Sequence, residues 1–280
     1  GKSNGSTSAI GLDKLLSIEE ACGGSGNDTI NGRTDVSSQL EGAAGNDTLN
    51  GGRFNDELIG GSGNDVLNGG AGFDCADYAD ATSNLTINLG NGTNGFAQGG
   101  SDVGRDTLNS IEEACGGKGN DSITGRSDVS SQLEGGLGND NLSGGKYGDT
   151  LIGGEGTDFL NGALGTDALT GGLGADVFAF TSWGTSNVDH ITDFYSSQGD
   201  KIQVSKSAFR ITASVVSLSV VNGSTQLNTA LASSNLFVYD QSSGNLYWNQ
   251  NGSTSGFGSG GIFAILDNKP SLTASNISLI

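Results

Sequence analysis

Aspartates recur at fixed intervals in this sequence, and the residues around them recur in the same phase. Between Gly135 and Ala179, five consecutive units of nine residues read GGLGNDNLS, GGKYGDTLI, GGEGTDFLN, GALGTDALT and GGLGADVFA. Each unit has glycine or alanine at the first two places, aspartate at the sixth and an apolar residue at the eighth. Carboxylate and carbonyl oxygens are the ligands that calcium prefers. The pattern therefore predicts a row of sites for a hard divalent cation.

The glycines and apolar residues of each unit predict the elements that position these carboxylates. Glycine at the first, second and fourth places permits positive φ and close backbone approach, so the first six residues can form a tight turn. The last three form a short strand whose middle side chain points inward. Two units then make one winding, windings stack at about 4.8 Å, and each Asp lies above the Asp two units later. The inward residues are Leu142, Leu151, Leu160, Leu169 and Phe178.

The nine-residue period resembles the repeats of the RTX, or haemolysin-type calcium-binding, family. The resemblance implies an all-β fold: a right-handed parallel β-roll, or β-solenoid, with a C-terminal β-rich cap. It implies that each ion binds the second- and fourth-place carbonyls and the Asp of one turn. The first- and third-place carbonyls and the Asp of the turn two units on complete the site. The implied carboxylate pairs are Asp140 with Asp158, Asp149 with Asp167, and Asp158 with Asp176.

The same pattern occurs a second time upstream. Residues 18–74 align with residues 111–167 at an offset of 93, and 39 of the 57 positions are identical. The upstream copy adds the carboxylate pairs Asp47 with Asp65 and Asp56 with Asp74. Stacked carboxylates repel one another without a cation, so the metal is expected to be part of the fold.

Carrying the family pattern over residue by residue gives the candidate calcium ligands, which would hold about five to eight ions. In the upstream copy they are Gly24, Gly26, Asp28, Ala43, Gly45, Asp47, Gly52, Phe54, Asp56, Gly60, Gly61, Ser62, Gly63, Asp65, Gly69, Ala71 and Asp74. In the downstream copy they are Gly117, Gly119, Asp121, Gly136, Gly138, Asp140, Gly145, Tyr147, Asp149, Gly153, Gly154, Glu155, Gly156, Asp158, Gly162, Leu164, Asp167, Gly171, Leu173 and Asp176.

One unit in each copy is irregular. Residues 32–41 (GRTDVSSQLE) and 125–134 (GRSDVSSQLE) have ten residues instead of nine. Their aspartates, Asp35 and Asp128, stand at the fourth place and not at the sixth. These windings are expected to bulge, and a ligand role for the two aspartates stays open.

The sequence divides into four regions: a first repeat block (1–77), longer intervening windings (78–114), a second block (115–179) and a cap (180–280). Leu85, Ile87 and Leu89 alternate as in a half-buried strand, and residues 90–100 are expected to form a loop. Residues 78–92 and 104–112 resemble the segment that separates nonapeptide blocks in RTX chains. Residues 8–20 resemble 101–113, so we expect the chain to begin inside a winding and to be part of a longer protein.

The cap is richer in aromatic and β-branched residues than the blocks. Ile191, Phe194 and Ile202 lie in a segment that resembles the one after the last RTX nonapeptide, and they are expected to cover the open end of the solenoid. Strands are predicted at 236–240, 245–249 and 262–266, with a turn at 243–244. The apolar tail 272–280 fits a type I secretion signal or a final strand.

Composition limits the partners and the location. Fifty glycines and one proline in 280 residues are typical of a turn-rich β protein. A net charge of −19 argues against nucleic acid and anionic membranes as partners. The sequence has no membrane-spanning run. Calcium modules of extracellular proteins bind at about 10⁻⁴ to 10⁻³ M, which suits a secreted, extracellular or cell-surface protein.

Other chemistry finds little support in the residue types. His190 is the single histidine, which excludes a zinc site built on several histidines; pairing with Asp189 or Asp193 as a dyad is less favoured than a surface or packing role. The cap aromatics Tyr239, Tyr247, Trp248 and Phe257 are expected to pack and not to bind carbohydrate.

The three cysteines leave an alternative open. Cys22 and Cys115 are 93 residues apart, or roughly 24 Å of stacking, which is too far for a disulfide. A Cys75–Cys115 disulfide spans only one intervening segment, and free thiols are the alternative.

We predict a calcium-binding module, without a catalytic site of its own, that folds on calcium binding outside the cell. In that role it would stabilise a larger extracellular protein or support its type I secretion, with that machinery as a partner. Two alternatives are a self-associating unit of a calcium-dependent surface layer, fibre or adhesin, and the non-catalytic tail of a secreted enzyme or toxin.

Overall fold

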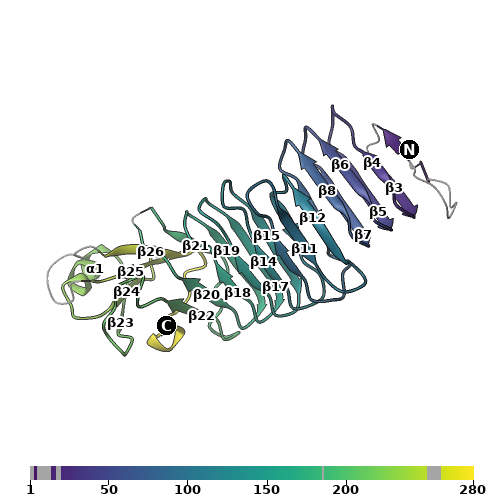
Figure 1. Ribbon diagram of the computed structural model, residues 1–280. Helices are drawn as coiled ribbons and strands as arrows, with labels where there is room; N and C mark the ends of the chain where they lie inside the picture. The colour runs from purple at the N-terminus through teal and green to yellow at the C-terminus, as the bar shows by residue number, and fades with distance from the viewer. Residues whose placement is uncertain (1–2, 5–13, 17–19, 185, 251–259) are drawn as a thin grey trace.

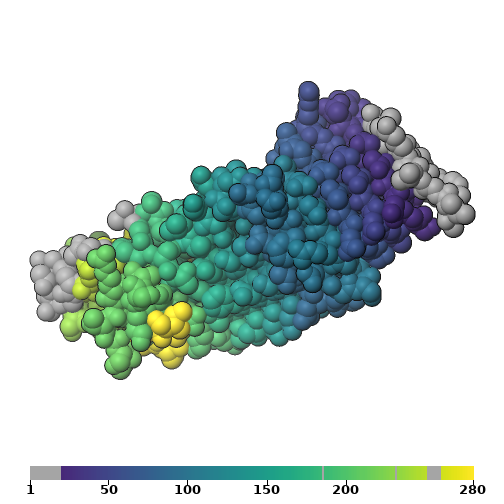
Figure 2. All heavy atoms as spheres, in the orientation of Figure 1, coloured from purple at the N-terminus to yellow at the C-terminus, as the bar shows by residue number. Residues whose placement is uncertain are grey.

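The computed structural model describes residues 3–4, 14–16, 20–184, 186–250 and 260–280. The chain winds into a parallel β-solenoid in which strands alternate between two long sheets (Figure 1). The molecule is elongated, with the first repeat block at one end and the C-terminal region at the other (Figure 2). The structure thus has the all-β, parallel solenoid architecture that the nonapeptides predict.

The first sheet has 14 strands. In spatial order they are β1 (Ser3–Asn4), β3 (Glu20–Ser25), β5 (Gln39–Ala44), β7 (Glu57–Ser62), β9 (Cys75–Asp77), β13 (Glu113–Cys115), β15 (Gln132–Leu137), β17 (Thr150–Gly156), β19 (Ala168–Gly174), β21 (Asp189–Ile191), β26 (Gly261–Leu266), β25 (Asn245–Trp248), β24 (Phe237–Asp240) and β23 (Leu218–Val221).

The second sheet has 13 strands. In spatial order they are β2 (Lys14–Leu16), β4 (Thr29–Asn31), β6 (Thr48–Gly52), β8 (Val66–Gly70), β12 (Arg105–Asn109), β11 (Gly95–Gln98), β10 (Thr86–Asn88), β14 (Ser122–Thr124), β16 (Asn141–Ser143), β18 (Phe159–Asn161), β20 (Val177–Phe180), β22 (Lys201–Val204) and β27 (Ile277–Leu279).

Register in both sheets places residues one winding apart beside each other. Leu142 pairs with Leu160 in the second sheet, and Leu151 pairs with Leu169 in the first. All five predicted inward residues of the second block, Phe178 included, are fully buried. Strands such as β16, β17, β18 and β19 therefore each contribute one buried leucine to a narrow core between the sheets, as side-chain alternation predicts.

The intervening region differs from its prediction in one respect. Leu85, Ile87 and Leu89 are buried and flank or belong to β10, as expected. The predicted loop 90–100, however, contains β11, which pairs antiparallel with both β10 and β12. Alternating burial in β11 explains the strand, because Gly95 and Ala97 face the core and are too small to be read as a hydrophobic pattern.

The segment after the last nonapeptide continues the solenoid. Strand β21 pairs with β19 and β22 pairs with β20, both in parallel. Ile191, Phe194 and Ile202 are fully buried, so they cover the preceding winding by forming a further winding.

The predicted hairpin is present as β24 and β25, with Gly244 in the turn. The tail forms a 3₁₀ helix (Ala274–Asn276) and β27, which pairs with β22. The described residues also include an α-helix, α1 (Ser224–Leu231), which was not expected. No helix in the described part of the chain is long and apolar enough to span a membrane.

The four predicted region boundaries remain predictions. The expectation that the chain begins inside a winding involves residues 8–20, of which only 14–16 and Glu20 are among those the structure describes.

Candidate metal centre

The turns between strands form two rows of carboxylates along the solenoid. In each row, the backbone N–H of one member donates to a carboxylate oxygen of the next, which is Oδ1 of an Asp or, once, Oε2 of Glu112. The row that leads into the second sheet contains Asp28, Asp47, Asp65 and Asp106, and then Asp121, Asp140, Asp158, Asp176 and Asp200. The row that leads into the first sheet contains Ser38, Asp56, Asp74 and Glu112, and then Ser131, Asp149, Asp167 and Asp189.

The structure brings together all five carboxylate pairs that the sequence analysis named. The N–H to Oδ1 distances are 2.7 Å for Asp47 to Asp65, 2.8 Å for Asp56 to Asp74, 2.8 Å for Asp140 to Asp158, 2.8 Å for Asp149 to Asp167 and 3.0 Å for Asp158 to Asp176. Stacking by one winding therefore produces the carboxylate contacts that a shared cation would need.

The second oxygen of most of these carboxylates is buried and has no hydrogen-bond partner. This is unusual, because buried polar atoms in folded proteins are nearly always satisfied. A bound cation is the partner that would satisfy a negatively charged oxygen. The unpaired atoms are Oδ2 of Asp47, Asp56, Asp65, Asp74, Asp140, Asp158, Asp167 and Asp176.

The first-place glycines leave room for further oxygens beside these atoms. A Cβ added to Gly144 would stand 2.6 Å from both Asp149 Oδ2 and the carbonyl oxygen of Gly162. At Gly51, both Asp56 Oδ2 and the Gly69 carbonyl oxygen would be 2.5 Å away. An Asp oxygen thus converges with the first-place carbonyl of the next winding, as the calcium pattern requires. These residues fit a calcium ion, which binds oxygens at about 2.3–2.6 Å.

Glycine serves different purposes at different places of the unit. Gly136 and Gly154 at the second place, and Gly138 and Gly156 at the fourth, have φ between 100° and 144°. The first-place glycines do not have positive φ and are instead needed for the space beside the carboxylate. Ala163 takes the second place with a φ of 72°, a conformation that costs a non-glycine residue free energy.

Several of the other predicted carbonyl ligands, at the second and third places, already accept hydrogen bonds between windings. Gly145 and Gly52 at the second place accept from third-place N–H groups. Glu155 and Ser62 at the third place accept from fourth-place N–H groups at 2.8 and 2.9 Å. A carbonyl oxygen has two lone pairs, so these bonds leave one free on each.

Burial makes the carboxylates poor anions when no cation is present. Desolvation, with Asp121 and Asp158 adding repulsion, raises the pKa of Asp140 to about 7. Desolvation also raises the pKa of Asp65 and of Asp74 to about 6. Burial thus disfavours the charged form of the row, and a bound cation would favour it.

The irregular units place a serine, not an aspartate, in the row. Ser38 and Ser131 donate their N–H groups to Asp56 and Asp149 at 2.6 Å. Asp35 and Asp128 instead point outward and pair with Arg33 and Arg126, with side chains 66% and 42% exposed. Neither aspartate joins the carboxylate row. The place of Ser38 in the row could have been predicted from the sequence. Ser38 precedes the inward Leu40 by two residues, just as each sixth-place Asp precedes the apolar residue of its own unit.

Arg126, in the irregular unit of the second block, contacts a carboxylate of the second row. The Arg126 guanidinium is buried and contacts Glu112, and it also pairs with Asp128 at 2.8 Å. Glu112 in turn accepts the N–H of Asp74 at 3.1 Å. The protein thus supplies its own cation at this winding, which lacks an Asp at the sixth place.

The sequence analysis missed two of the pairs and four further members of the rows. The pairs Asp28 with Asp47 and Asp121 with Asp140 are separated by 19 residues because a ten-residue unit lies between them. Asp106, Glu112, Asp189 and Asp200 extend the rows from segments without the glycine pattern. Position relative to the buried apolar residue would have revealed Asp106, which precedes Leu108 by two.

His190 does not form a dyad with either neighbouring aspartate. Its Nδ1 lies 3.0 Å from Oδ1 of Asp267, and both side chains are about two-fifths exposed. Asp189 is buried in the second row, and Asp193 accepts the N–H groups of Gly171 and Gly172. The favoured surface role of His190 agrees with this geometry.

The aromatic side chains of the cap pack inside it, as expected. Tyr239 and Trp248 are among the largest fully buried residues, and Tyr247 is 8% exposed. The fourth aromatic of that prediction, Phe257, lies outside the described residues.

Comparison with known proteins agrees with this geometry. A family model described as the RTX calcium-binding nonapeptide repeat matches residues 23–35 and 41–74. A second model, described as the C-terminal domain of serralysin M10 peptidases, matches residues 69–253, about two thirds of the chain. Both modules are non-catalytic and typical of secreted bacterial proteins.

A search of curated proteins gave no match. Among solved structures, the extracellular lipase LipA from Serratia marcescens aligns with 95% of this chain and 40% of its own, at 19% identity and a TM-score of 0.26. A TM-score of that size does not establish a shared fold, and the chain spans about two fifths of the lipase's length. The two family matches together show that the chain belongs to the RTX calcium-binding repeat proteins with a serralysin-type C-terminal domain.

Proposed function

We propose that this chain is a calcium-loaded module that folds when calcium reaches it outside the cell and stabilises a larger extracellular protein. The observation that carries the proposal is the set of eight buried aspartate oxygens without a hydrogen-bond partner. In a cation-free chain these groups oppose folding, because each carries its desolvation cost without compensation. Calcium reverses the balance, so binding and folding occur together.

The carboxylate rows limit the number of ions. Seven stacked pairs join sixth-place aspartates of the repeat units: Asp28 with Asp47, Asp47 with Asp65, Asp56 with Asp74, Asp121 with Asp140, Asp140 with Asp158, Asp149 with Asp167, and Asp158 with Asp176. One ion for each pair gives seven, inside the expected range of five to eight. The predicted glycine, alanine and other turn carbonyls would complete each coordination sphere.

Coupling between calcium and folding suits export in an unfolded state. Calcium modules with dissociation constants of about 10⁻⁴ to 10⁻³ M are empty in a cytosol and filled outside it. The chain would therefore remain unfolded inside the cell, pass through a type I secretion route, and fold on arrival. In this role the chain has no catalytic task, and any catalysis belongs to other parts of the full-length protein.

Circular dichroism of the purified chain tests the proposal. We expect little β signal after EDTA treatment, and a cooperative gain of β structure when calcium is added. Magnesium at the same concentration serves as the control, because its smaller ion demands octahedral geometry and retains its waters. A chain that is equally β-rich and equally cooperative in EDTA would contradict the proposal.

A further inference from the structure

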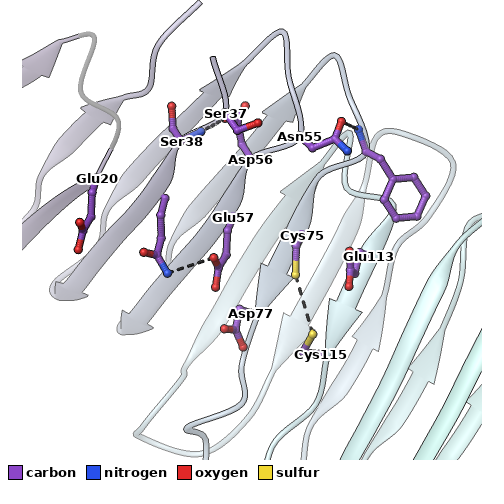
Figure 3. A pocket seen from close by; sticks show the side chains of 12 residues that line it. Glu20, Ser37, Ser38, Asn55, Asp56, Glu57, Cys75, Asp77, Glu113 and Cys115 are labelled. Carbon is purple, nitrogen blue, oxygen red and sulfur yellow. Dashed lines mark hydrogen bonds between the residues drawn. The ribbon is translucent and has the colours of Figure 1, made fainter.

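Two cysteines and a glutamate come together in a groove on the first sheet. Cys75 lies on β9 and Cys115 on the neighbouring parallel strand β13. Their Sγ atoms are 3.9 Å apart, and Figure 3 shows the two thiols directed toward each other. Both cysteines are partly buried.

Glu113 supplies a third donor beside the two thiols. It pairs in register with Cys75, and each of Cys75, Cys115 and Glu113 offers a ligand atom within 4.8 Å of the others. Asp77 pairs with Cys115 in the same register. Asp77 and Glu57 line the same shallow groove, which has a volume of about 660 Å³ (Figure 3). The groove therefore surrounds the thiols with carboxylates and favours a cation.

The spacing of the sulfur atoms fits a shared metal better than a disulfide. Two thiolates on a tetrahedral zinc ion, each about 2.3 Å from the metal, lie about 3.8 Å apart. A disulfide needs about 2.05 Å between the sulfurs and Cα atoms closer than about 7 Å. Cys75 and Cys115 are diagonal in the register, offset by two residues across one strand spacing. Such an offset separates Cα atoms by about 8 Å.

We propose that Cys75, Cys115 and Glu113 form a site for a thiophilic divalent cation of the Zn²⁺ class. Its donor set separates it from the calcium rows, because thiolates bind zinc-like ions and oxygen ligands bind calcium. The site joins β9 and β13, the strands at which the first sheet passes from one repeat block to the next. A metal there would tie the two blocks together across a point where the second sheet is interrupted by the antiparallel β10–β11–β12 segment.

The site is tested on calcium-saturated, reduced chain, with Co²⁺ as the spectroscopic probe and Zn²⁺ as the competitor. We expect one Co²⁺ per chain with a thiolate charge-transfer band and intense tetrahedral d–d bands, both abolished by stoichiometric Zn²⁺. Cys75→Ser and Cys115→Ser should each remove the band and weaken Zn²⁺ binding at least tenfold. Cys22→Ser is the matched control: Cys22 is the counterpart of Cys115 in the upstream copy, is exposed, and should leave both unchanged.

A second variant separates the glutamate from the thiols. Glu113→Gln should retain the charge-transfer band, lower Zn²⁺ affinity several-fold, and change the d–d bands that report coordination geometry. Circular dichroism in calcium shows whether each variant remains folded. Absence of a thiolate band in the wild-type chain, or a band that survives Cys75→Ser, would overturn the proposal. The proposal would also be overturned if unreduced protein formed a Cys75–Cys115 disulfide, seen in its mass as the loss of two hydrogens, and bound no metal.

Discussion

The repeat windings and the C-terminal region close their cores in different ways. Each repeat strand contributes one apolar side chain, and the unpaired carboxylate oxygens found in the described residues lie between Asp47 and Asp176. In the C-terminal region, the rings of Trp183, Phe209 and Trp248 pack with centroids 5.0 to 5.4 Å apart. The difference teaches that repetition extends a thin core at the cost of buried carboxylates that call for cations. If the proposed function is right, the windings depend on calcium and the aromatic core does not.

Removal of calcium should have the largest effect. It should unfold the windings while part of the C-terminal region stays folded. Both tryptophans, Trp183 and Trp248, lie in the C-terminal region, so their fluorescence reports on that region alone. Far-ultraviolet circular dichroism reports mostly on the windings. In EDTA we expect the β signal in circular dichroism to be lost. The fluorescence of Trp183 and Trp248 should still show, in part, that these two side chains are packed together. Loss of both signals in one transition would show that the C-terminal region also depends on the ions.

Core truncations should separate the two regions by their calcium dependence. Leu160→Ala removes a fully buried side chain from the windings, and Phe263→Ala removes one from the aromatic core. The expected losses in free energy of unfolding are about 2–5 and about 3–5 kcal/mol. Leu160→Ala should also raise the calcium concentration at half-folding, measured by dichroism. Phe263→Ala should lower the thermal midpoint followed by tryptophan fluorescence and leave the calcium midpoint in place.

Asp158→Asn tests the shared role of one carboxylate. Asp158 belongs to two pairs, with Asp140 and with Asp176. Asparagine keeps an oxygen for the Asp140 N–H but removes the charge, so calcium binding should weaken at two sites. A site occupied at ten times its dissociation constant contributes about 1.4 kcal/mol, which gives a loss of about 3 kcal/mol in calcium.

The same variant should behave in the opposite way without calcium, because it removes a buried charge. Residual structure in EDTA should be equal to or greater than in the wild type. Asp128→Asn is the control, since Asp128 lies outside the rows and is partly exposed. Equal calcium midpoints for Asp158→Asn and Asp128→Asn would exclude a ligand role for Asp158.

pH should shift the calcium midpoint by a smaller amount. The pKa of Asp140 is raised to about 7 by burial, compared with about 3.9 in an unfolded chain. Between these values the calcium-free fold holds protons that the unfolded chain has released, so its stability falls as pH rises. Calcium displaces those protons, and apparent calcium affinity should therefore increase from about pH 5 to about pH 8. Calcium titrations that give the same midpoint across this range would contradict the raised pKa values.

Periodicity made the solenoid and its carboxylate pairs predictable. Glycine, Asp and Leu recur every nine residues, and stacking of identical units then fixes which residues meet. Prediction was weakest where the period breaks. A ten-residue unit obscured the pairs of Asp28 and Asp121, and the small residues Gly95 and Ala97 concealed β11. The thiol cluster was only partly visible, because the sequence left a Cys75–Cys115 disulfide open as one alternative. The register of these cysteines with Glu113 depends on strand pairing that sequence spacing does not determine.

The most direct test is an anomalous difference map from crystals grown in millimolar calcium. The account predicts calcium peaks between Asp140 and Asp158 and between Asp149 and Asp167. Each peak should lie within bonding distance of the Oδ2 atoms of its two aspartates, which have no partner in the structure except for Asp149 Oδ2, the acceptor of the Gly145 N–H. The first-place carbonyl oxygens of Gly153 and Gly162 should be ligands in the same peaks. Water at these positions, or carboxylates that remain protonated and metal-free at saturating calcium, would contradict it.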